Sequence, residues 1–312
     1  MNTISEAMES YEQLSVSKTQ YIESMYERYH SILFQYADRL PTTEIKKIEI
    51  EDDRVTMTTR SRGIRIECPR EDLRTVAIEI LNFKFYEKPE LTIIEQMLLD
   101  DCKVLDIGAN VGWYSLNLAL SKSASSIYSF EPIPQTYEYL VRNLSINLIQ
   151  NVKHYNLALS NFAGTTRFYY YPQGTGNASA ANLSGREEVQ TIECKVLTID
   201  EFVEIEGIHT IDFIKCDVEG SELFVFQGGI NTISRFKPII FTEILRKWTE
   251  KFNYSANEIF EFLRKLGYCA FKLVDRQLIE LSTMTEATLE TNFFFLHREN
   301  HEHLVQKYCT SH

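Results

Sequence analysis

The sequence predicts an α/β fold in which a mostly parallel sheet is covered by helices on both faces. From about Glu90 onward, short apolar segments alternate with longer helical ones, and such alternation is typical of parallel strands joined by helices. The chain has 312 residues, of which 44% are hydrophobic. This length and composition suffice for one large domain with an appendage.

Two further elements precede the alternating region. Residues 1–40 are polar with apolar residues at helical spacing, which predicts one or two amphipathic helices. The segment "KIEIEDDRVTMTTRSRGIRIECP" alternates apolar and polar residues on either side of "RSRG", which predicts a small exposed hairpin. We therefore expect an appendage over 1–85, the main domain over 86–298 and a polar tail over 299–312.

The strands of the main domain follow in order, with helices between them. Each is an apolar run bounded by turn or helix signals. They are "KVLDIG", "SIYSFEP", "VKHYNLAL", "IDFIKCDVEG", "KPIIFTEI", "YCAFKL" and "NFFFLH".

The segment "YYPQGTGNASAANLSG", Tyr170 to Gly185, departs from this alternation because it is rich in Gly, Ser and Asn. It predicts either a long mobile loop that orders over an acceptor or an ordinary hairpin loop.

Composition excludes several classes of partner. The formal net charge of -12 and a pI near 5.2 argue against nonspecific binding to nucleic acid or to anionic membranes. No stretch is long and apolar enough to span a bilayer, and the N-terminus lacks the pattern of a secretion signal. The six cysteines have no paired spacing, so we expect reduced thiols. These features predict a cytoplasmic protein.

A strand, a glycine-rich turn and the start of a helix follow one another in "VLDIGANVGWYS", residues Val104 to Ser115. Such a unit binds either a dinucleotide or S-adenosylmethionine. A dinucleotide site needs glycine at three places, whereas the first of them here is Asp106, whose carboxylate would repel a pyrophosphate. The amino group and sulfonium of S-adenosylmethionine are positive and suit this acid. The turn therefore favours S-adenosylmethionine over a nicotinamide dinucleotide.

Other residues of the turn fit the same ligand. Gly108 and Gly112 let the backbone and the helix come close to it. Asn110, Tyr114 and Ser115 can hydrogen-bond the methionine carboxylate near a helix N-terminus.

Glu131 ends the next predicted strand, "SIYSFEP". An acid at this place would accept hydrogen bonds from both ribose hydroxyls of an adenosine. Helix capping by Asp106 and Glu131 is the alternative, but two acids at consecutive strand ends favour the ligand.

Six segments together resemble the FkbM family of S-adenosylmethionine-dependent methyltransferases over roughly residues 85–297. They are "YEKPE", "VLDIGANVGWYS", "FEPIPQTYEYLVRN", "NLALSN", "IDFIKCDVEGSEL" and "KPIIFTEI". The resemblance implies a class I methyltransferase fold, which is Rossmann-like, with a seven-stranded sheet whose last strand, "NFFFLH", is antiparallel. It also implies O-methylation of a sugar or polyketide hydroxyl.

The resemblance also implies where the cofactor binds. "NLALSN" matches the segment that lines the adenine, with Leu157 where many methyltransferases have an aspartate. The residues carried over to the cofactor site are Asp106, Gly108, Ala109, Asn110, Gly112, Tyr114, Ser115, Glu131, Pro132, Asn156, Ala158 and Asp217.

Three acids are candidates for catalysis. Asp217 closes the fourth predicted strand, Glu219 follows it, and Glu243 ends the fifth. Strand ends in open α/β sheets face one crevice, and methyl transfer to a hydroxyl needs a base there. Helix capping is the alternative role, and it suits Glu222 better than Asp217 or Glu219.

Magnesium is an alternative to direct base catalysis. Some O-methyltransferases bind this metal with acids at the ends of strands four and five, where Asp217 and Glu243 stand. The catechol-type enzymes add a lysine one turn later, at the place of Gly220 in this chain. We therefore assign no metal ligand, and magnesium is the less favoured alternative.

The predicted function is S-adenosylmethionine-dependent O-methylation of a hydroxyl on a sugar, a glycan or a glycosylated natural product. The alternatives are a polyketide or other secondary-metabolite hydroxyl, or a noncatalytic scaffold that binds the cofactor. The expected partner is a small-molecule or glycan acceptor. The appendage is the part that we expect to set acceptor choice or to mediate a homodimer.

Overall fold

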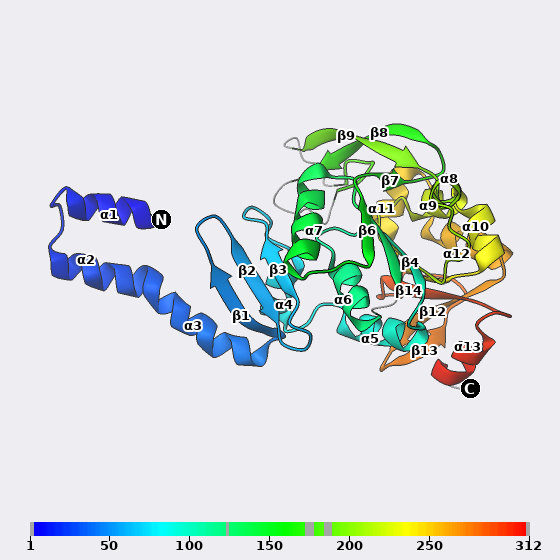
Figure 1. Cartoon of the computed structure of the whole chain (residues 1–312), viewed down its shortest axis with the longest axis horizontal. Coiled ribbons are helices and arrows are strands. Elements are labelled where there is room, and N and C mark those ends of the chain that lie inside the picture. Colours follow the sequence, from blue (N-terminus) through cyan, green and yellow to red (C-terminus); the bar gives the residue numbers. More distant parts are fainter. Residues whose placement is uncertain (1–2, 123–124, 172–177, 184–188, 310–312) are drawn as a thin grey trace.

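The computed structural model describes residues 3–122, 125–171, 178–183 and 189–309. Its centre is a large twisted sheet (Figure 1). The strands of this sheet are β4 (Lys103–Ile107), β5 (Ser126–Phe130), β6 (Val152–Tyr155), β10 (Phe213–Cys216), β11 (Ile239–Glu243), β12 (Tyr268–Val274), β13 (Gln277–Glu280) and β14 (Asn292–His297). Their order is β13-β12-β14-β11-β10-β4-β5-β6.

The predicted fold class is confirmed, with one strand more than expected. Strands β6, β5, β4, β10 and β11 pair in parallel, and β14, the predicted "NFFFLH", runs antiparallel to β11 and β12. The eighth strand, β13, forms a hairpin with β12 through a turn at Asp275 and Arg276, which both have positive φ. The prediction of seven strands missed it because its four residues are too short for an alternating pattern.

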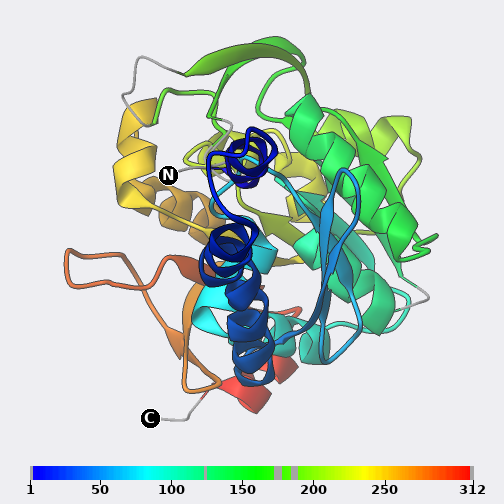
Figure 2. The ribbon, with the colours of Figure 1, turned by 90° about the vertical axis from the view of Figure 1, so that its left-hand side faces the viewer.

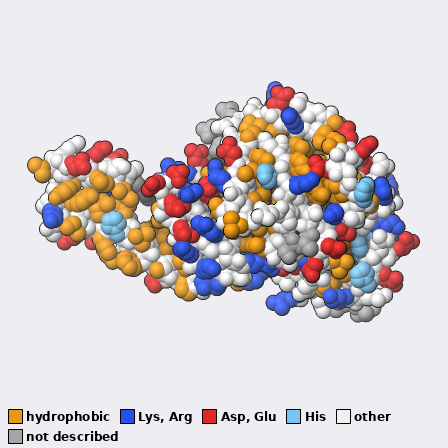
Figure 3. Space-filling view, viewed as in Figure 1, with side chains coloured by type: hydrophobic (Ala, Val, Ile, Leu, Met, Phe, Trp, Pro, Cys, Tyr) orange, Lys and Arg blue, Asp and Glu red, His pale blue; other side chains and the backbone are white. Residues whose placement is uncertain are grey.

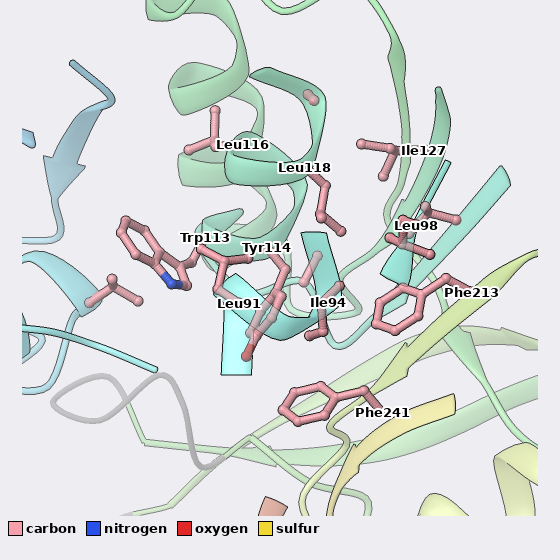
Figure 4. Packing of buried hydrophobic residues seen from close by; sticks show 14 of the residues in the cluster. Leu91, Ile94, Leu98, Trp113, Tyr114, Leu116, Leu118, Ile127, Phe213 and Phe241 are labelled. Atoms are coloured by element: carbon pink, nitrogen blue, oxygen red, sulfur yellow. The ribbon is translucent and has the colours of Figure 1, made fainter. Parts of the chain in front are cut away.

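Helices cover both faces of the sheet. The successive side chains of a strand point to opposite faces, so that Val104 packs with the helices of one layer and Leu105 with those of the other. The first layer holds α5 (Lys88–Met97), α6 (Trp113–Ser121) and α7 (Pro134–Ile146). Figure 4 shows Leu91 and Ile94 of α5 and Leu118 of α6 in this layer. The second layer holds α8 (Ile199–Ile205), α9 (Glu222–Gln227), α10 (Ile230–Phe236) and α12 (Ala256–Lys265).

The predicted hairpin is present as β2 (Val55–Thr59) and β3 (Arg65–Cys68), but these two strands are largely buried, and a third strand, β1 (Ile45–Ile50), which is mostly not buried, pairs with β2. The three strands form an antiparallel sheet. The prediction missed the first turn, where the Glu51 amide donates to the Arg54 carbonyl at 3.0 Å. Met57 and Ile66 join the main core, so this sheet packs on the body of the molecule. Helix α4 (Val76–Phe83) follows it.

The helices predicted for residues 1–40 are present and stand away from the body in Figure 1. In Figure 2 they face the viewer and lie in front of the body. They are α1 (Ile4–Glu12), α2 (Lys18–Met25) and α3 (Ser31–Arg39), with a π turn, η1 (Tyr26–His30), and a 3-10 turn, η2 (Leu40–Thr42). Thr3 and Ser17 form capping boxes that start α1 and α2.

The predicted strand "VKHYNLAL" is divided between two sheets. Strand β6 ends at Tyr155, and the following β7 (Ala158–Leu159) belongs to a small sheet with β8 (Gly164–Tyr170) and β9 (Gln190–Leu197).

The described residues also form the helices α11 (Arg246–Thr249), η4 (Glu250–Phe252) and α13 (Glu302–Tyr308).

The C-terminal residues and the cysteines can also be compared with the predictions from the sequence. Residues expected to be a polar tail form α13, whose Leu304 is buried in the main core. All six cysteines are free, three of them buried and three partly buried. Within the described ranges, no helix combines the length and the apolar character needed to cross a bilayer.

Candidate functional site

The glycine-rich turn after β4 is held in a shape that larger side chains would prevent. Gly108 and Gly112 have φ of +76° and +94°, a region that favours glycine. A Cβ on Gly108 would lie 1.8 Å from the carbonyl oxygen of Asp217. Asn110 also has a positive φ, and its side-chain oxygen accepts a hydrogen bond from the Val111 amide at 2.7 Å. The turn therefore lies directly against the end of β10.

A partly open cavity of about 150 Å³ lies at the carboxyl ends of β4, β5, β10 and β11. Of the residues that the sequence predicts for the site, those that line this cavity are Gly108, Ala109, Asn110, Tyr114, Glu131, Pro132, Ala158, Asp217, Glu219 and Glu243. Those that do not line it are Asp106, Gly112, Ser115 and Asn156.

Asp106 does not face the cavity, contrary to the expectation that it meets the positive groups of the ligand. It is fully buried, and its Oδ2 accepts hydrogen bonds from the Ser115 amide at 3.0 Å and the Ser115 hydroxyl at 2.5 Å. The reason is the pleat of β4, which points Asp106 to the same face as Val104, where α6 covers it. Asp106 therefore fixes the start of α6 beneath the turn.

Glu131 stands beside the turn and also faces the cavity. Its two carboxylate oxygens accept hydrogen bonds from the Asn110 amide at 3.0 Å and the Ile133 amide at 2.9 Å. Burial raises the pKa of Glu131 to about 7. The carboxylate is thus fixed in orientation, and it retains lone pairs for hydroxyl donors.

The segment after β6 forms one wall of the cavity. Leu157, Ala158 and Leu159 line it. The Asn156 amide group instead donates to the carbonyls of Glu131 and Pro132, both at 2.9 Å. Asn156 therefore supports the loop that carries Glu131, and Leu157 supplies an apolar surface where an aspartate is common in other methyltransferases.

The three candidate catalytic acids come together. One carboxylate oxygen each from Asp217, Glu219 and Glu243 lies within 4.8 Å of the others, an arrangement that could hold a metal ion. Burial and then the charge of Asp217 raise the pKa of Glu243 to about 8. Burial and the charges of Asp217 and Glu243 also hold the pKa of Glu219 well above its usual range. The cluster therefore brings three carboxyl groups together in one crevice, and two of them, Glu219 and Glu243, have raised pKa values, as is common for acids and bases of active sites.

Glu222 has the structural role that the sequence favours for it. Its Oε1 accepts hydrogen bonds from the Val218 amide at 3.2 Å and the Gly220 amide at 3.0 Å. It thereby closes the turn that carries Glu219, whose φ is +53°. Glu222 does not line the cavity.

Lys215 is a site residue that the sequence analysis missed. It lies opposite Asp106 in the parallel register of β10 and β4, and it is 5% exposed. Its Nζ donates to the Gly108 carbonyl at 2.8 Å and lies 3.3 Å from Asp217 Oδ2 and 3.8 Å from Asp106 Oδ1. One ammonium group therefore connects the turn to two acids. The available signal was a lysine inside the apolar strand "IDFIKC".

Tyr114 has a partner that was also missed. Its hydroxyl donates to Glu87 Oε2 at 2.6 Å, and Asn292 donates to Glu87 Oε1 at 3.3 Å. Burial raises the pKa of Glu87. The hydroxyl of Tyr114 is therefore engaged by Glu87, although the ring lines the cavity.

Residues from the expected appendage and the start of the main domain also reach the cavity. Arg74, Val76 and Tyr86 line it together with Trp113 of α6, and the Tyr86 and Trp113 rings meet edge to face at 6.3 Å. The Trp113 indole nitrogen is buried and has no hydrogen-bond partner among the described residues. This end of the cavity therefore offers donors outside the glycine-rich turn.

The predicted loop over Tyr170 to Gly185 lies partly outside the described residues, at 172–177 and 184–185. Of its described part, Ala178 lines the cavity. The Ser179 hydroxyl donates to the Glu219 carbonyl at 2.8 Å. This part of the loop therefore contacts the acid cluster.

Comparison with known proteins identifies the family. A family model described as the methyltransferase FkbM domain matches residues 106–269, which is more than half of the chain. The chain belongs to the FkbM methyltransferase family. The resemblance predicted from the sequence is therefore confirmed, and the match includes the glycine-rich turn, Glu131 and all three acids of the cluster.

Three relatives illustrate the range of this FkbM family. Methyltransferase sdnD of Sordaria araneosa is 31% identical over 40% of this chain and 59% of its own length. The hexuronic acid methyltransferase AglP of Haloferax volcanii is 25% identical over 49% of this chain and 61% of its own. The 2-O-methyltransferase NoeI of Sinorhizobium fredii is 26% identical over 54% of this chain and 70% of its own length. The chain thus spans about three-fifths of the length of sdnD and AglP.

Proposed function

We propose that this FkbM methyltransferase transfers the methyl group of S-adenosylmethionine to a hydroxyl of a sugar, a glycan or a glycosylated natural product. The observation that carries the proposal is the position of the Asp217, Glu219 and Glu243 carboxyls. They line the same cavity as the glycine-rich turn and Glu131. A bound cofactor and an acceptor would therefore meet in front of these acids.

The residues that would hold the cofactor fit its chemistry. The close approach of Gly108 to the Asp217 carbonyl leaves a turn with no side chain in the way. Glu131 would accept hydrogen bonds from the ribose hydroxyls, and Ala158 would contact the adenine. S-adenosylmethionine supplies an electrophilic methyl group, and the acceptor oxygen displaces the sulfur in line, leaving S-adenosylhomocysteine.

The acid cluster would orient the acceptor and take its proton. An alcohol has a very high pKa, so the proton must move to a carboxylate as the new carbon–oxygen bond forms. Several carboxyls in one crevice can accept hydrogen bonds from many hydroxyls, which suits a polyhydroxylated acceptor. The names of AglP and NoeI, which refer to a hexuronic acid and to 2-O-methylation, support this class.

The N-terminal part of the chain would contribute to acceptor choice. Arg74, Val76 and Tyr86 line the cavity but lie before the residues that the family model matches. These three residues would therefore add contacts to the acceptor that the matched segment does not supply.

The proposal is tested first by cofactor binding. Calorimetry should detect binding of S-adenosylhomocysteine but not of NAD. The change Glu131→Ala should weaken this binding by about 1–3 kcal/mol, because it removes the acceptor of two hydroxyl hydrogen bonds. Glu138→Ala, which changes a glutamate of α7 that does not line the cavity, is the matched control. Tight NAD binding, or an unchanged affinity in Glu131→Ala, would contradict the proposed cofactor site.

Affinity for S-adenosylhomocysteine should also depend on pH. Because the pKa of Glu131 is raised to about 7, this carboxyl is ionised above that pH and protonated below it. The ionised form accepts hydroxyl hydrogen bonds better, so lowering the pH from about 8 to about 6 should reduce the affinity by up to about tenfold. Titrations of Glu131→Gln should show a flatter dependence, and an equal slope in wild type and variant would assign the effect to other groups.

A further inference from the structure

The arm, defined as α1, α2, η1 and α3 over residues 4–39, has an unusually apolar surface. Nine of the twenty large hydrophobic side chains that are exposed among the described residues lie between Ile4 and Tyr36. Figure 3 shows these apolar side chains gathered on the part of the molecule that stands off from the body. A patch of this kind on a projecting element indicates a surface that binds another protein.

The arm is covered along only half of its length. From Lys18 to Arg39 the chain is helical without a break, and α1 folds back over α2, where Tyr11 and Tyr21 stack at 4.6 Å. In Figure 1 α1 lies along α2 and ends before α3. Helix α3 has no buried residue, and its Leu33 and Phe34 are 52% and 62% exposed.

A half-covered rod of this shape is complementary to itself. If two arms run antiparallel about a two-fold axis, the α1–α2 hairpin of each copy lies over the bare α3 of the other. Such an interface uses the same surface on both copies, which is the commonest form of dimer contact. It also leaves no unpaired apolar end, whereas a parallel arrangement would leave both copies of α3 uncovered by α1.

The sequence spacing agrees with a helical partner of the same kind. Ile22, Tyr26, Tyr29, Leu33, Tyr36 and Leu40 follow one another at alternating intervals of four and three residues. This is the interval pattern of helices that pair along a seam. The π turn at Tyr26–His30 lies within this row and separates Ile22 and Tyr26 from Leu33, Tyr36 and Leu40.

The charge of the arm disfavours an anionic lipid surface as its partner. Residues 3–40 carry six acids and three Lys or Arg, so an anionic membrane would repel them. The rod from Lys18 to Arg39 is about 33 Å long at 1.5 Å per residue.

We propose that the chain forms a two-fold dimer through antiparallel packing of its arms, with the α1–α2 hairpin of one copy on α3 of its partner. The dimer rests on the arm alone and does not depend on the proposed reaction. No residue of the arm is among those that line the cavity, and in Figure 1 the arm stands off from the central sheet, so the dimer contact lies away from the cavity.

Sedimentation analysis of the full chain over a wide concentration range tests the proposal. The wild type should be a dimer, and Leu33→Glu and Phe34→Glu should each raise the dimer dissociation constant by at least about 100-fold. Both side chains are exposed, so circular dichroism should show an unchanged fold. Leu148→Glu and Leu289→Glu are matched controls, because these leucines are 84% and 88% exposed outside the arm and should leave the dimer intact.

Three outcomes would overturn the proposal. The first is a wild-type chain that stays monomeric at every concentration, which would assign the arm to a different protein. The second is a dimer that persists in both arm variants. The third is a dimer that is lost equally in the control variants.

Discussion

The change Asp217→Asn should lower turnover by about 100-fold or more, and Glu243→Gln should do the same if that carboxyl is the base or a metal ligand. Each amide keeps the shape of the side chain and removes its ability to take a proton. The Lys215 ammonium lies 3.3 Å from Asp217 Oδ2, so Asp217→Asn would also remove one partner of this ion pair. Steady-state kinetics with a sugar acceptor measure the effect, and Glu250→Gln, an exposed glutamate outside the cavity, is the control.

The pH profile separates the roles of the two acids. Since the pKa of Glu243 is raised to about 8, this carboxyl is mostly protonated at neutral pH. If Glu243 is the base, kcat should rise as the pH increases through about 8, and this rise should vanish in Glu243→Gln. A profile without this rise, or a rise that persists in Glu243→Gln, would contradict the role of Glu243 as the base.

A chelator separates direct base catalysis from metal catalysis. Activity that is lost in EDTA and restored by magnesium would make Asp217 and Glu243 ligands, with Glu219 as the third carboxyl of the group. Indifference to EDTA would leave one carboxylate as the base. Near-normal turnover in both amide variants would contradict the assignment and direct attention to Glu219.

The change Lys215→Met should lower the free energy of unfolding by about 3–5 kcal/mol, the usual cost of leaving a buried charge without its partner. Asp106 is fully buried, and its Oδ1 has no hydrogen-bond partner among the described residues, with the Lys215 ammonium at 3.8 Å. Methionine fills a similar volume but leaves this carboxylate uncompensated. Urea unfolding measures the difference.

Two further variants make this stability prediction specific. Lys195→Met replaces an exposed lysine of β9 and should change the free energy of unfolding by less than about 0.5 kcal/mol. Adding Asp106→Asn to Lys215→Met removes the stranded charge and should recover part of the loss, which a double-mutant cycle quantifies. A Lys215→Met protein as stable as Lys195→Met would show that the pair contributes nothing.

The sequence predicts the parts of the site that depend on strand ends. Glu131, Asp217 and Glu243 each terminate an apolar segment, and parallel strands bring their carboxyl ends to one edge, so their convergence follows from the strand pattern. The loops that follow these strands, such as the one that carries Glu219, lie at the same edge of the sheet and could be predicted in the same way. The antiparallel direction of the "NFFFLH" strand was instead implied by the family resemblance, and the structure confirms it.

The direction of side chains was harder to predict than their position along the chain. Asp106 lies near the end of its strand as expected, but its side chain points beneath the turn. The side chains of β4 alternate between the two faces of the sheet, and Asp106 falls on the face that α6 covers. Its partner Lys215 could be found only after β4 and β10 were aligned in register. Glu87 meets Tyr114 across 27 residues of sequence, and nothing in either segment indicates the other.

The small sheet shows a different limit. The second turn, "RSRG", gave a clear signal, but the first, near Glu51 and Arg54, lay inside a run of charged residues. Burial of Met57 and Ile66 depends on the approach of α7, whose Asn143 side chain accepts a hydrogen bond from the Glu67 amide at 2.8 Å. The pattern of apolar and polar residues along one strand does not indicate contacts with distant segments such as this one.

Lys215 is a single side chain that supports both halves of the site. Its Nζ donates to the Gly108 carbonyl at 2.8 Å and lies 3.3 Å from Asp217 Oδ2. A substitution at Lys215 would therefore remove a support of the glycine-rich turn and a charge partner of the acid cluster together. Its effects on cofactor affinity and on turnover should for this reason not be separable by position alone.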